Sequence, residues 1–423
     1  MEVKPGYKNT DIGIIPTDWI PLPVVRMGEV LTGKALAASA PGKQRPYLRT
    51  KNVFDGRIDI DDVLTMPMTE AEFNRFGIRC GDVLLNEGQS LELVGRCAIY
   101  RDEYPEPCAI QNQLLRFRAR SGVSGDFASH LFRYAQQSGI FARVALQTTS
   151  IAHLGGKRFE KLVLAWPPTE AEQCAIATAL SDVDALLGGL DRLIAKKRDL
   201  KQAAMQQLLA GQTRLPGFHG EWGAKRLGNY VTFLRNGQNS RAELLSEGQV
   251  KYLHYGDIHA SRDIYLMPDS LPNLSREKAA RLDRLQDGDL IFADASEDLV
   301  GVSKSVEMKG IGTTEVVSGQ HTIAARFDKA VLADGFKGFL QFCPSFANHL
   351  RRLAAGTKVY ATNRAYISSV EMCLPSVSEQ VAITAVLSDM DAELAVLEAR
   401  RDKTRNLKQA MMQELLTGKT RLM

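Results

Sequence analysis

Apolar residues recur at alternating steps of four and three in two long stretches, one near the middle of the chain and one at its end. This spacing places them along one face of a helix and is typical of a coiled-coil seam. The seam positions of the first stretch are Ile176, Leu180, Val183, Leu187 and Leu190, followed by Leu200 and Leu208. Those of the second stretch are Ile383, Leu387, Met390, Leu394 and Leu397, followed by Leu407 and Leu415. The pattern predicts two long amphipathic helices, over residues 168–215 and 375–423.

The two helical stretches are copies of one another. Residues 172–215 align with residues 379–422 without a gap, and 25 of the 44 positions are identical. The offset, 379 minus 172, is 207 residues and therefore about half of the 423-residue chain. A period of this length indicates the duplication of a whole module, because solenoid repeats are much shorter.

Both copies begin and end with the same local signals. Residues 169–172 (TEAE) and 376–379 (SVSE) fit a capping box, in which a hydroxyl and a carboxylate satisfy free amide hydrogens at a helix start. Gly211 and Gly418 follow where a helix end favours a positive φ. A helix of about 40 residues would be roughly 60 Å long. Since a single amphipathic rod is not stable alone in water, we expect the two copies to pack against each other.

The duplication extends into the parts of the chain that precede the helices. Short β-branched and apolar runs, separated by Gly, Asp and Asn, indicate strands and turns in residues 20–165 and 216–373. Gly81-Asp82 matches Gly288-Asp289, and Gln113 falls opposite Gln320, at the same offset of 207. A helical stretch closes each part, at 127–142 and 335–353. We therefore predict an arm over residues 1–19 and two strand-rich α+β domains, each followed by one long helix.

The composition is that of an ordinary globular protein, with 44% hydrophobic and 24% charged residues. No apolar run approaches the roughly 20 residues of a membrane span, and the start, MEVKP, lacks a signal-peptide pattern. We therefore expect a cytoplasmic protein. The net charge of +4 is compatible with nucleic-acid binding without requiring it. The cysteines lack metal-site spacing and are expected to be reduced thiols: Cys80, Cys97, Cys108, Cys174, Cys343 and Cys373.

Short motifs in and around the two helices carry a resemblance to a known family. They are WPP at 166–168, EQ at 172–173, LKQA at 200–203, LLAG at 208–211 and RL at 214–215. The second copy has LP at 374–375, EQ at 379–380, LKQA at 407–410, LLTG at 415–418 and RL at 421–422. With these motifs the chain resembles the specificity (S) subunits of Type I restriction-modification systems. The resemblance covers the layout of the whole chain and is most specific in the helices.

This resemblance implies a fold, a function and a set of partners. The fold is α+β with a pseudo-two-fold internal duplication: two strand-rich globular target recognition domains, separated by two long antiparallel helices. Each domain reads one half of an asymmetric bipartite site in double-stranded DNA. Two methyltransferase subunits bind through the helices, and motor-nuclease subunits join the full complex. Adenine methylation and restriction then belong to these partners, with S-adenosylmethionine on the methyltransferase, so this chain is expected to be non-catalytic and to hold no cofactor or metal.

Polar side chains that can reach bases and phosphates gather at the landmarks of both domains. In the first domain they are Arg49, Lys51, Asn52, Arg96, Gln111, Asn112 and Gln113, with Ser150, His153, Lys157 and Arg158 in the loop 149–158. In the second domain they are His254, Tyr255, Asp257, Gln320 and His321, with Lys358, Tyr360, Asn363 and Arg364 in the loop 357–364. The alternative for each residue is an ordinary solvated loop position.

Basic residues also gather in the middle of both helices: Lys196, Lys197, Arg198, Arg400, Arg401, Lys403 and Arg405. They either pair with nearby carboxylates, such as Asp191, Asp199, Glu398 and Asp402, on a solvated face, or they contact the DNA backbone. Apolar helix positions that stay exposed are expected to pack against the methyltransferase subunits.

Signatures of catalysis are incomplete. GKT at 418–420 ends like a phosphate-binding loop, but Gln413 stands where that loop requires Gly. Asp82 and Glu87, and likewise Asp289 and Asp294, have the spacing of nuclease carboxylates but lack the companion Glu-x-Lys. Two other functions stay open. One is an interaction scaffold with two protein-binding domains on a coiled-coil spacer, and the other is a nuclease that cuts alone with a metal ion.

Overall fold

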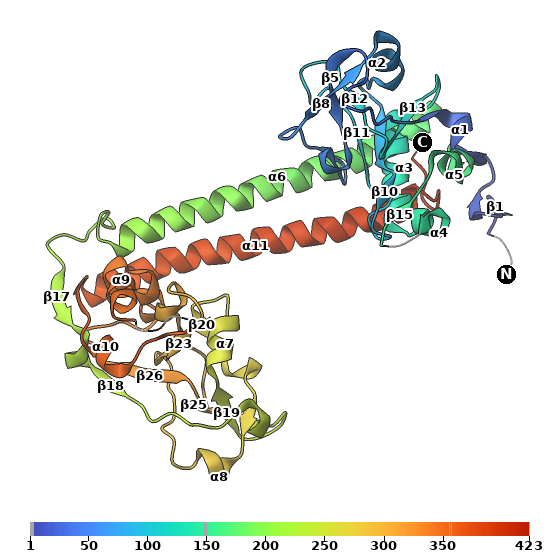
Figure 1. Cartoon of the computed structure of the whole chain (residues 1–423). Coiled ribbons are helices and arrows are strands. Elements are labelled where there is room, and N and C mark those ends of the chain that lie inside the picture. Colours follow the sequence, from blue (N-terminus) through green and yellow to red (C-terminus); the bar gives the residue numbers. More distant parts are fainter. Residues whose placement is uncertain (1–3, 148–149, 355, 357, 423) are drawn as a thin grey trace. The chain divides into compact units, whose positions relative to one another are not determined.

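The computed structural model describes residues 4–147, 150–354, 356 and 358–422, and the chain divides into two compact units (Figure 1). Unit 1 comprises Met1–Asp191 and Ala399–Met423, and unit 2 comprises Arg192–Glu398. The two long helices are α6 (Glu170–Leu209) and α11 (Val377–Leu415). Unit 1 therefore contains the start of α6 and the end of α11, whereas unit 2 contains the end of α6 and the start of α11.

Unit 1 is built from short strands and short helices around the helix ends. Its strands are β1 (Tyr7–Thr10), β2 (Gly13–Pro16), β3 (Ile20–Pro23), β4 (Gly28–Thr32), β5 (Lys43–Leu48), β6 (Val53–Phe54), β7 (Arg57–Ile58), β8 (Leu64–Met68), β9 (Val83–Asn86), β10 (Gly88–Gln89), β11 (Cys97–Ile99), β12 (Ala109–Ile110), β13 (Leu114–Ala119), β14 (Leu146–Gln147), β15 (Ala152–His153) and β16 (Val163–Trp166). Its helices are α1 (Val24–Met27), α2 (Glu70–Phe76), α3 (Gly125–Gln137), α4 (Ile140–Val144) and α5 (Gly156–Lys161).

Unit 2 repeats this composition. Its strands are β17 (Gly223–Arg226), β18 (Val231–Phe233), β19 (Val250–Leu253), β20 (Tyr265–Leu266), β21 (Asn273–Leu274), β22 (Leu290–Ala293), β23 (Ala295–Ser296), β24 (Ser305–Met308), β25 (Glu315–Ser318), β26 (Thr322–Phe327), β27 (Tyr360–Ala361) and β28 (Glu371–Leu374). Its helices are α7 (Tyr255–Ala260), α8 (Arg276–Ala279), α9 (Pro344–Leu353) and α10 (Arg364–Ser368), and a 3-10 turn covers Lys337–Phe342.

The sheets of the two units share their central strands, while β20 is added at one edge of the main sheet in unit 2 and β14 extends the pair β10·β15 in unit 1. The main sheet has the order β4-β13-β9-β11 in unit 1 and β18-β26-β22-β24-β20 in unit 2. The second sheet has the order β8-β5-β12 and, correspondingly, β21-β19-β25, and in both its last pair runs parallel. Two smaller pairs, β3·β16 and β10·β15, correspond to β17·β28 and β23·β27. The α+β fold class and the internal duplication are therefore as predicted.

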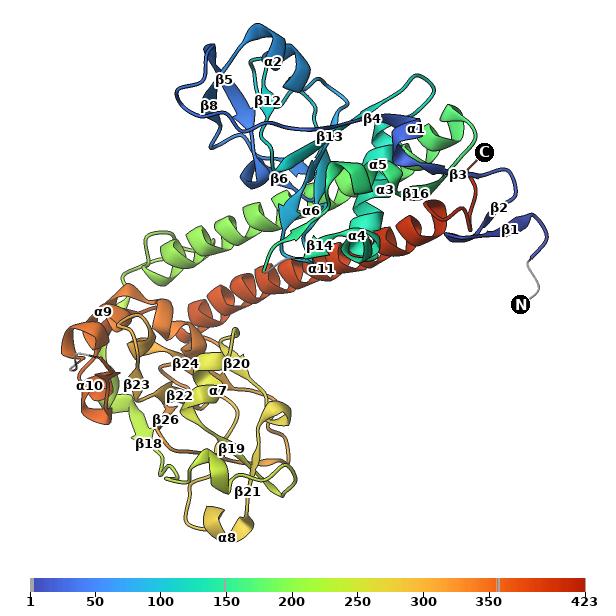
Figure 2. The ribbon, with the colours of Figure 1, turned by 45° about the vertical axis from the view of Figure 1, so that its right-hand side comes forward.

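The helical stretches predicted at 127–142 and 335–353 are each broken in two. Gly139 has a φ of 75° and ends the first half at the gap between α3 and α4. In unit 2, Pro344 lacks an amide hydrogen and therefore starts the separate helix α9 after the 3-10 turn. Figure 2 shows α3, α4 and α5 gathered beside the helix ends of unit 1.

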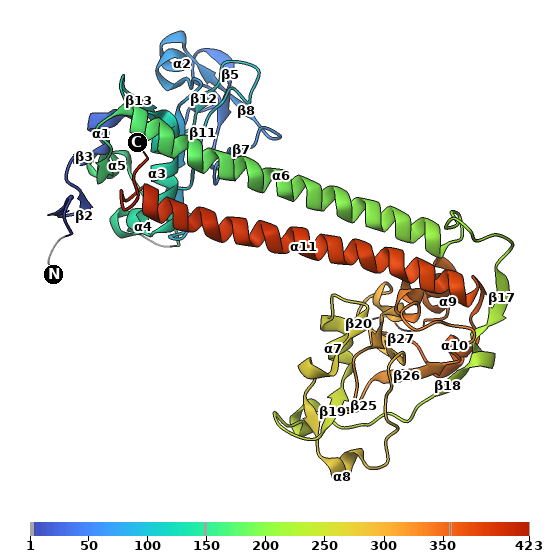
Figure 3. The same cartoon turned by 180° about the vertical axis from the view of Figure 1, so that it is seen from behind.

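The core of unit 1 joins the domain to the helix ends. Trp19 and Trp166 are almost fully buried together with Ile176 and Leu180 of α6 and Leu415 of α11. Phenylalanine rings fill the space between the sheet and α3; Phe117 and Phe132 lie edge to face with centroids 5.0 Å apart. In unit 2, Leu208 shares one cluster with Ile383 and Leu387. In each unit the end of one helix therefore packs against the start of the other, so the helices run antiparallel there (Figure 3).

The buried face of each helix follows one uninterrupted repeat of four and three. In α6, Ile176, Leu180, Leu190 and Leu208 are buried as predicted, and Val183 and Leu187 are half-buried. In α11, Ile383, Leu387, Leu394 and Leu415 are buried, and Met390 and Leu397 are half-buried. The prediction is wrong at Leu200 and Leu407, which are 48% and 55% exposed.

The seam continues through polar residues where the prediction skipped a step. Ile194, which the sequence analysis missed, is 2% exposed, and the next seam steps in α6 are Lys197 and Lys201. In α11 the matching steps are Arg401, Thr404 and Lys408, of which Thr404 and Lys408 are buried. Leu200 and Leu407 each lie one residue before a seam lysine. Their side chains therefore point away from the seam.

Ion pairs join the two helices at equivalent positions. In unit 1, Lys408 contacts Asp184 at 2.5 Å, and in unit 2 Lys201 contacts Asp391. Adding 207 to Asp184 and Lys201 gives Asp391 and Lys408, so the second pair is the pseudo-two-fold copy of the first. Burial lowers the pKa of Lys408 despite its carboxylate partner. Burial also opposes ionisation of Asp184, but Arg133 and Lys408 outweigh it and lower that pKa.

Most of the mid-helix basic residues pair with carboxylates. Lys197 contacts Glu393 at 2.7 Å, and Arg198 contacts Glu398. Arg401 contacts Asp402 at 2.9 Å and Asp191 at 3.9 Å, and Arg405 contacts Asp402 at 3.3 Å. Lys196, Arg400 and Lys403 are exposed. The structure thus accounts for four of the seven by ion pairs.

The helix starts use half of the predicted capping box. The Thr169 and Ser376 hydroxyls accept from the amides of Glu172 and Glu379 at 3.3 Å. The carboxylates, however, accept from arginines beyond the other helix end: Arg421 donates to Glu172 at 2.8 Å, and Arg214 donates to Glu379 at 2.6 Å. Arg421 also donates twice to Asp18, at 2.8 Å each.

In each unit one further hydrogen bond joins the globular part to the start of a long helix. The Gln173 side chain accepts from the Ser124 amide at 2.9 Å, and Gln380 accepts from the Ala333 amide at 2.8 Å. The helix ends carry Gly211 and Gly418 with φ of 67° and 71°, as predicted. A side chain at Gly418 would overlap Pro16, because the hairpin β1–β2 packs on this helix end. Within the part of the chain described, no helix is long and apolar enough to cross a lipid bilayer.

Candidate nucleic-acid interface

Four stretches of unit 1 meet at one end of its main sheet and form what we call the polar edge: residues 48–52, 86–89, 111–113 and 152–154. The Gln111 amide donates to Leu48 O at 2.9 Å, which places the turn before β13 beside the end of β5. The Glu87 amide donates to Gln113 O at 2.8 Å, and the Leu154 amide donates to Glu87 O at 2.8 Å. Backbone hydrogen bonds therefore fix which side chains stand together.

The polar edge of unit 2 comprises residues 253–257, 293–296, 319–321 and 360–362 and has the same bonds. The Gly319 amide donates to Leu253 O at 2.8 Å, and the Asp294 amide donates to His321 O at 3.1 Å. The Thr362 amide donates to Asp294 O at 2.8 Å. Asp294 thus takes the place of Glu87, and His321 takes the place of Gln113. The predicted match of Gln113 with Gln320 is wrong by one residue, because unit 2 has one more residue between Asp294 and this turn than unit 1 has between Glu87 and its turn.

The side chains on the two edges differ although the backbone is shared. In unit 1, His153 Nδ1 lies 2.9 Å from Glu87 Oε2, while Asn112 and Gln113 are exposed. In unit 2, His321 Nδ1 lies 3.2 Å from Asp294 Oδ1. His321 has a φ of 58°, a left-handed conformation that costs energy for most residues and is typical of turns and functional sites.

Tyr255 forms the second exposed group on the polar edge of unit 2. Its ring centroid lies 5.5 Å from that of His321, edge to face, and 4.5 Å from that of His254. Tyr255 is 36% exposed, and Gln320 beside it is half-buried. The Tyr255 amide approaches Gln320 O at 3.4 Å. The structure therefore brings together three of the predicted residues, Tyr255, Gln320 and His321, from two separate stretches.

Several other predicted residues serve the fold. Asn52 is 1% exposed and donates to Asp59 O and Asp62 O, and its side chain accepts from the Arg49 amide. The roles of the others are as follows: His254 and Asp257 cap α7, Arg158 donates to the carbonyls of His153 and Leu154, Asn363 caps α10, and Arg364 donates to Leu234 O. These side chains use part of their hydrogen-bonding capacity within the fold, while Arg158, Asn363 and Arg364 are exposed.

The remaining predicted residues are available at the surface to different degrees. Arg49 and Lys51 both contact Asp62, at 2.7 and 2.6 Å, and Arg96 lies over the Phe54 ring at 4.9 Å. Half-buried Gln111 and Tyr360, and exposed Ser150, Lys157 and Lys358, complete the set. Thr149 and Thr357, the first residues of the two predicted loops, lie outside the described residues.

Sequence reasoning misses three DNA candidates: Glu87 and Asp294 on the polar edges, and Arg241 beside the polar edge of unit 2. Glu87 and Asp294 were considered only as nuclease carboxylates, yet each holds a histidine. Arg241 reaches within 3.6 Å of Asp257 and is 64% exposed at the side chain. Nothing local in the sequence marks these residues, because the partners are brought together by strand pairing.

The carboxylates with nuclease-like spacing are occupied by structural contacts. Asp82 and Asp289 are buried and accept paired hydrogen bonds from Arg118 and Arg326, all at 2.7–2.8 Å. These bonds raise the pKa of both arginines. No group of three His, Cys, Asp or Glu side chains with metal-binding geometry occurs among the residues described.

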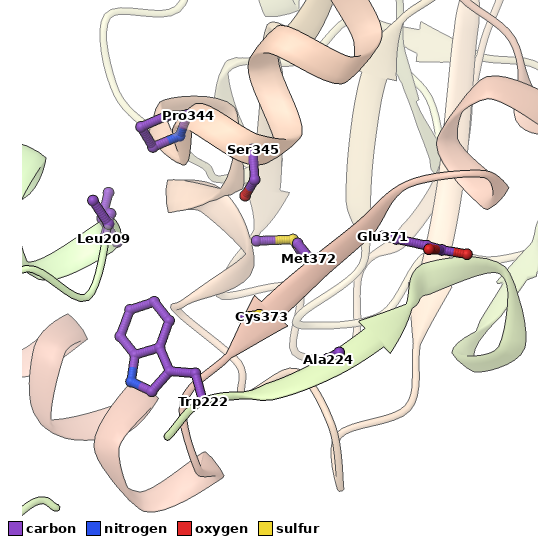
Figure 4. A pocket seen from close by; sticks show the side chains of 9 residues that line it. Leu209, Trp222, Ala224, Pro344, Ser345, Glu371, Met372 and Cys373 are labelled. Carbon is purple, nitrogen blue, oxygen red and sulfur yellow. The ribbon is translucent and has the colours of Figure 1, made fainter. Parts of the chain in front are cut away.

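A pocket of about 530 Å³ lies in unit 2 (Figure 4). Its lining is mainly apolar, including Leu209, Trp222 and Met372, and its only ionisable side chains are Glu371 and Cys373. Figure 4 shows that the lining comes from the end of α6, β17, α9 and β28. Because the pocket offers one carboxylate and no basic partner, it lacks the paired acid and base of a catalytic site.

These features define a class: an internally duplicated protein whose two units present different side chains on one shared polar edge. Sequence comparison finds relatives in Methanocaldococcus jannaschii. A protein provisionally assigned as the MjaX type I restriction enzyme specificity subunit is 23% identical over 436 residues, 99% of this chain and 97% of that protein. The MjaVIII specificity subunit is 22% identical and covers 96% of this chain and 94% of its own length. No protein-family model matches.

Solved structures agree on the fold. The HsdS subunit from Thermoanaerobacter tengcongensis has a TM-score of 0.55 and 18% identity, and covers 96% of this chain and 98% of its own. The Type I system S subunit from M. genitalium has a TM-score of 0.55 at 13% identity, covering 98% of each chain. Over nearly its whole length the chain is therefore similar to Type I restriction-modification specificity subunits, and its fold is that of the solved S subunits.

Proposed function

We propose that this chain is a non-catalytic specificity subunit of a Type I restriction-modification system, and that it reads an asymmetric bipartite site in double-stranded DNA, one half with each polar edge. The observation that carries the proposal is the shared backbone of the two edges combined with their different side chains. A common frame presents each edge to a duplex in the same way, and different side chains select different bases. The two half-sites are therefore different sequences.

The partners we propose are two methyltransferase subunits and, in the full complex, motor-nuclease subunits. Exposed leucines on α6 support a helix-borne interface: Leu186, Leu193 and Leu200 are 43%, 39% and 48% exposed at steps of seven. This spacing places them on one face of the helix, away from the seam. Adenine methylation is then performed by the methyltransferase with its own S-adenosylmethionine, in the cytoplasm. This chain determines which DNA sites are methylated.

Selection of duplexes from a random pool tests this proposal. The complex of the full chain with its methyltransferase is expected to enrich two short motifs separated by a fixed gap. Its affinity for the enriched duplex should fall steeply with salt, because phosphate contacts release counterions. Recovery of the pool without enrichment, with binding indifferent to salt, would favour the interaction scaffold instead.

A further inference from the structure

Each polar edge holds one exposed histidine against a carboxylate at the same backbone position. In unit 1 the carboxylate is Glu87 and the histidine is His153 of β15, at 2.9 Å. In unit 2 the carboxylate is Asp294 and the histidine is His321 of the turn before β26, at 3.2 Å. The two histidines are not equivalent in the duplication, because the position of His153 is taken by Ala361 in unit 2. The same arrangement is thus built from different strands.

Both histidine side chains are open to solvent on one side and held on the other. The side chains of His153 and His321 are 42% and 52% exposed, whereas those of Glu87 and Asp294 are 15% and 33% exposed. The absence of a side chain at Gly88 leaves room for His153, since an added Cβ would lie 3.1 Å from its ring. His321 is oriented further by the edge of Tyr255.

The carboxylate decides which ring nitrogen carries the hydrogen. A carboxylate accepts hydrogen bonds, so Nδ1 donates to it, and in the neutral ring Nε2 is left as an acceptor. Across the residues that the structure describes, neither Nε2 has a hydrogen-bond partner. Each polar edge therefore presents one fixed acceptor atom to the solvent. In the major groove the base groups that donate are the exocyclic amino groups of adenine and cytosine.

We propose that His153 and His321 are specificity-determining residues, and that each accepts a hydrogen bond through Nε2 from the exocyclic amino group of an adenine or cytosine in its own half-site. This inference rests on the proposed function, because it assigns an atom to base reading that the proposed DNA site must contain. Glu87 and Asp294 are positioning residues that hold the ring and its hydrogen.

Asparagine is the substitution that tests this role most cleanly. His153→Asn and His321→Asn keep a polar group where Nδ1 stands and remove the atom at the position of Nε2. Asparagine also adopts the positive φ of His321 more readily than most residues. His219→Ala is the matched control, because His219 is an exposed histidine of unit 2 outside the polar edge.

The experiment maps the bases methylated by the complex of the methyltransferase with the full wild-type chain or each variant. His321→Asn is expected to lose about tenfold discrimination at one base pair of one half-site, the size of a single mismatch. His153→Asn should do the same in the other half-site, and His219→Ala should leave the motif unchanged. Asp294→Ala should relax the same base pair as His321→Asn, since it acts through that ring.

The outcomes separate this inference from the proposed function. A wild-type motif that survives both asparagine substitutions overturns the inference and leaves the proposed function intact. A uniform loss of methylation on all sites, with the motif unchanged, indicates phosphate contact and also overturns it. A wild-type complex that methylates without any motif contradicts the proposed function itself. Co-purification of each variant with the methyltransferase verifies that it is folded.

Discussion

At the scale of single residues, arginine–carboxylate pairs recur at equivalent positions and hold each unit together. Arg118 with Asp82 and Arg326 with Asp289 link β13 to the start of β9, and β26 to the start of β22. Both carboxylates are about 2% exposed, so each needs a partner to remain charged inside the protein. These residues explain why the carboxylates persist in both copies without any catalytic role.

Arg118→Ala should destabilise unit 1 by about 2–4 kcal/mol, because it leaves the Asp82 carboxylate buried without a counter-charge. Denaturant unfolding followed by tryptophan fluorescence measures this change. Trp222→Phe is included in every chain so that Trp19 and Trp166 of unit 1 report alone. Arg101→Ala is the control, since the Arg101–Asp126 pair is about half exposed on both sides. Equal stabilities of the two variants would show that the buried pair does not matter.

Buried His130 gives unit 1 a pH-dependent stability. Its Nε2 lies 3.0 Å from Ser181 Oγ of α6, and burial, with Arg133 nearby, lowers its pKa from 6.5 to about 4. Between these values the unfolded chain binds a proton that the folded chain does not. Stability is therefore complete above pH 6.5 and should fall by about 2–3 kcal/mol as the pH drops towards 4.

The His130→Gln variant removes this titration while retaining a polar group near Ser181. With the same fluorescence measurement, its unfolding free energy should change less between pH 6.5 and 4.5 than that of the parent chain. Parallel pH dependences in the two chains would assign the acid sensitivity to other groups, with the Asp184 and Lys408 pair beside His130 as the next to examine.

At the scale of elements, the long helices were predictable because their apolar period is strong over 40 residues. The central error, at Leu200 and Leu407, has a physical cause. Lysines occupy the seam steps at Lys201 and Lys408, and their ion pairs with carboxylates of the other helix replace apolar contacts. A search for apolar residues alone therefore assigns these seam positions to the neighbouring leucines. Ile194 is apolar, but its counterpart in α11 is Arg401, so this seam step is not apolar in both copies.

Substitution of Ile194 and of Leu200 by alanine tests which of the two side chains belongs to the buried seam. Ile194→Ala removes a side chain that is 2% exposed and should cost about 2–4 kcal/mol in unit 2. Leu200→Ala removes one that is 48% exposed and should barely change stability. Thermal unfolding of the two variants distinguishes them. A larger loss from Leu200→Ala would restore the originally predicted seam.

Leu200→Ala should instead weaken assembly with the methyltransferase, together with Leu193→Ala on the same face of α6. Titration of labelled chain with the methyltransferase measures this affinity, and Leu200→Ala should raise the Kd several-fold. Unchanged affinity of the double variant would exclude this face of α6 from the interface.

For the polar edges, the sequence predicts single residues but not the pairs that they form. Residues such as Gln113 and Tyr255 could be proposed from their type and their place between strands. The pairing of His153 with Glu87 spans 66 positions, and that of His321 with Asp294 spans 27. Because strand pairing alone brings these partners together, neither is visible in a local pattern. Conversely, Asn52 and Asn363 are polar residues of a kind that can bind DNA, but Asn52 stabilises a turn and Asn363 caps the start of α10.

At the scale of the whole molecule, two kinds of ion pair that join the helix ends occur as pseudo-two-fold copies. The pair Asp184–Lys408 corresponds to Lys201–Asp391, and Glu172–Arg421 corresponds to Glu379–Arg214. The first half of the chain, residues 1–216, carries one member of each of these four pairs, and therefore both the acidic and the basic partner of each kind. Two copies of this half-chain therefore have the charges needed to form the same contacts across a true two-fold axis.

We predict that the half-chain 1–216 forms a dimer that directs the methyltransferase to a symmetric site made of the first half-site and its inverted repeat. Light scattering measures the dimer, and methylation mapping measures the site. Lys201→Glu should weaken the dimer by placing like charges opposite Asp184, and Lys201→Glu with Asp184→Lys should recover it. A half-chain that remains a monomer, or modifies only asymmetric DNA, contradicts this prediction.

The most direct test of the account is the mapping of methylated bases in DNA modified by the methyltransferase with and without this chain. We predict a bipartite motif with two different halves and a fixed gap, present only when the full chain is included. A motif that persists without the chain, or an active methyltransferase that modifies DNA without any motif in its presence, would contradict the claim that this subunit reads the sequence.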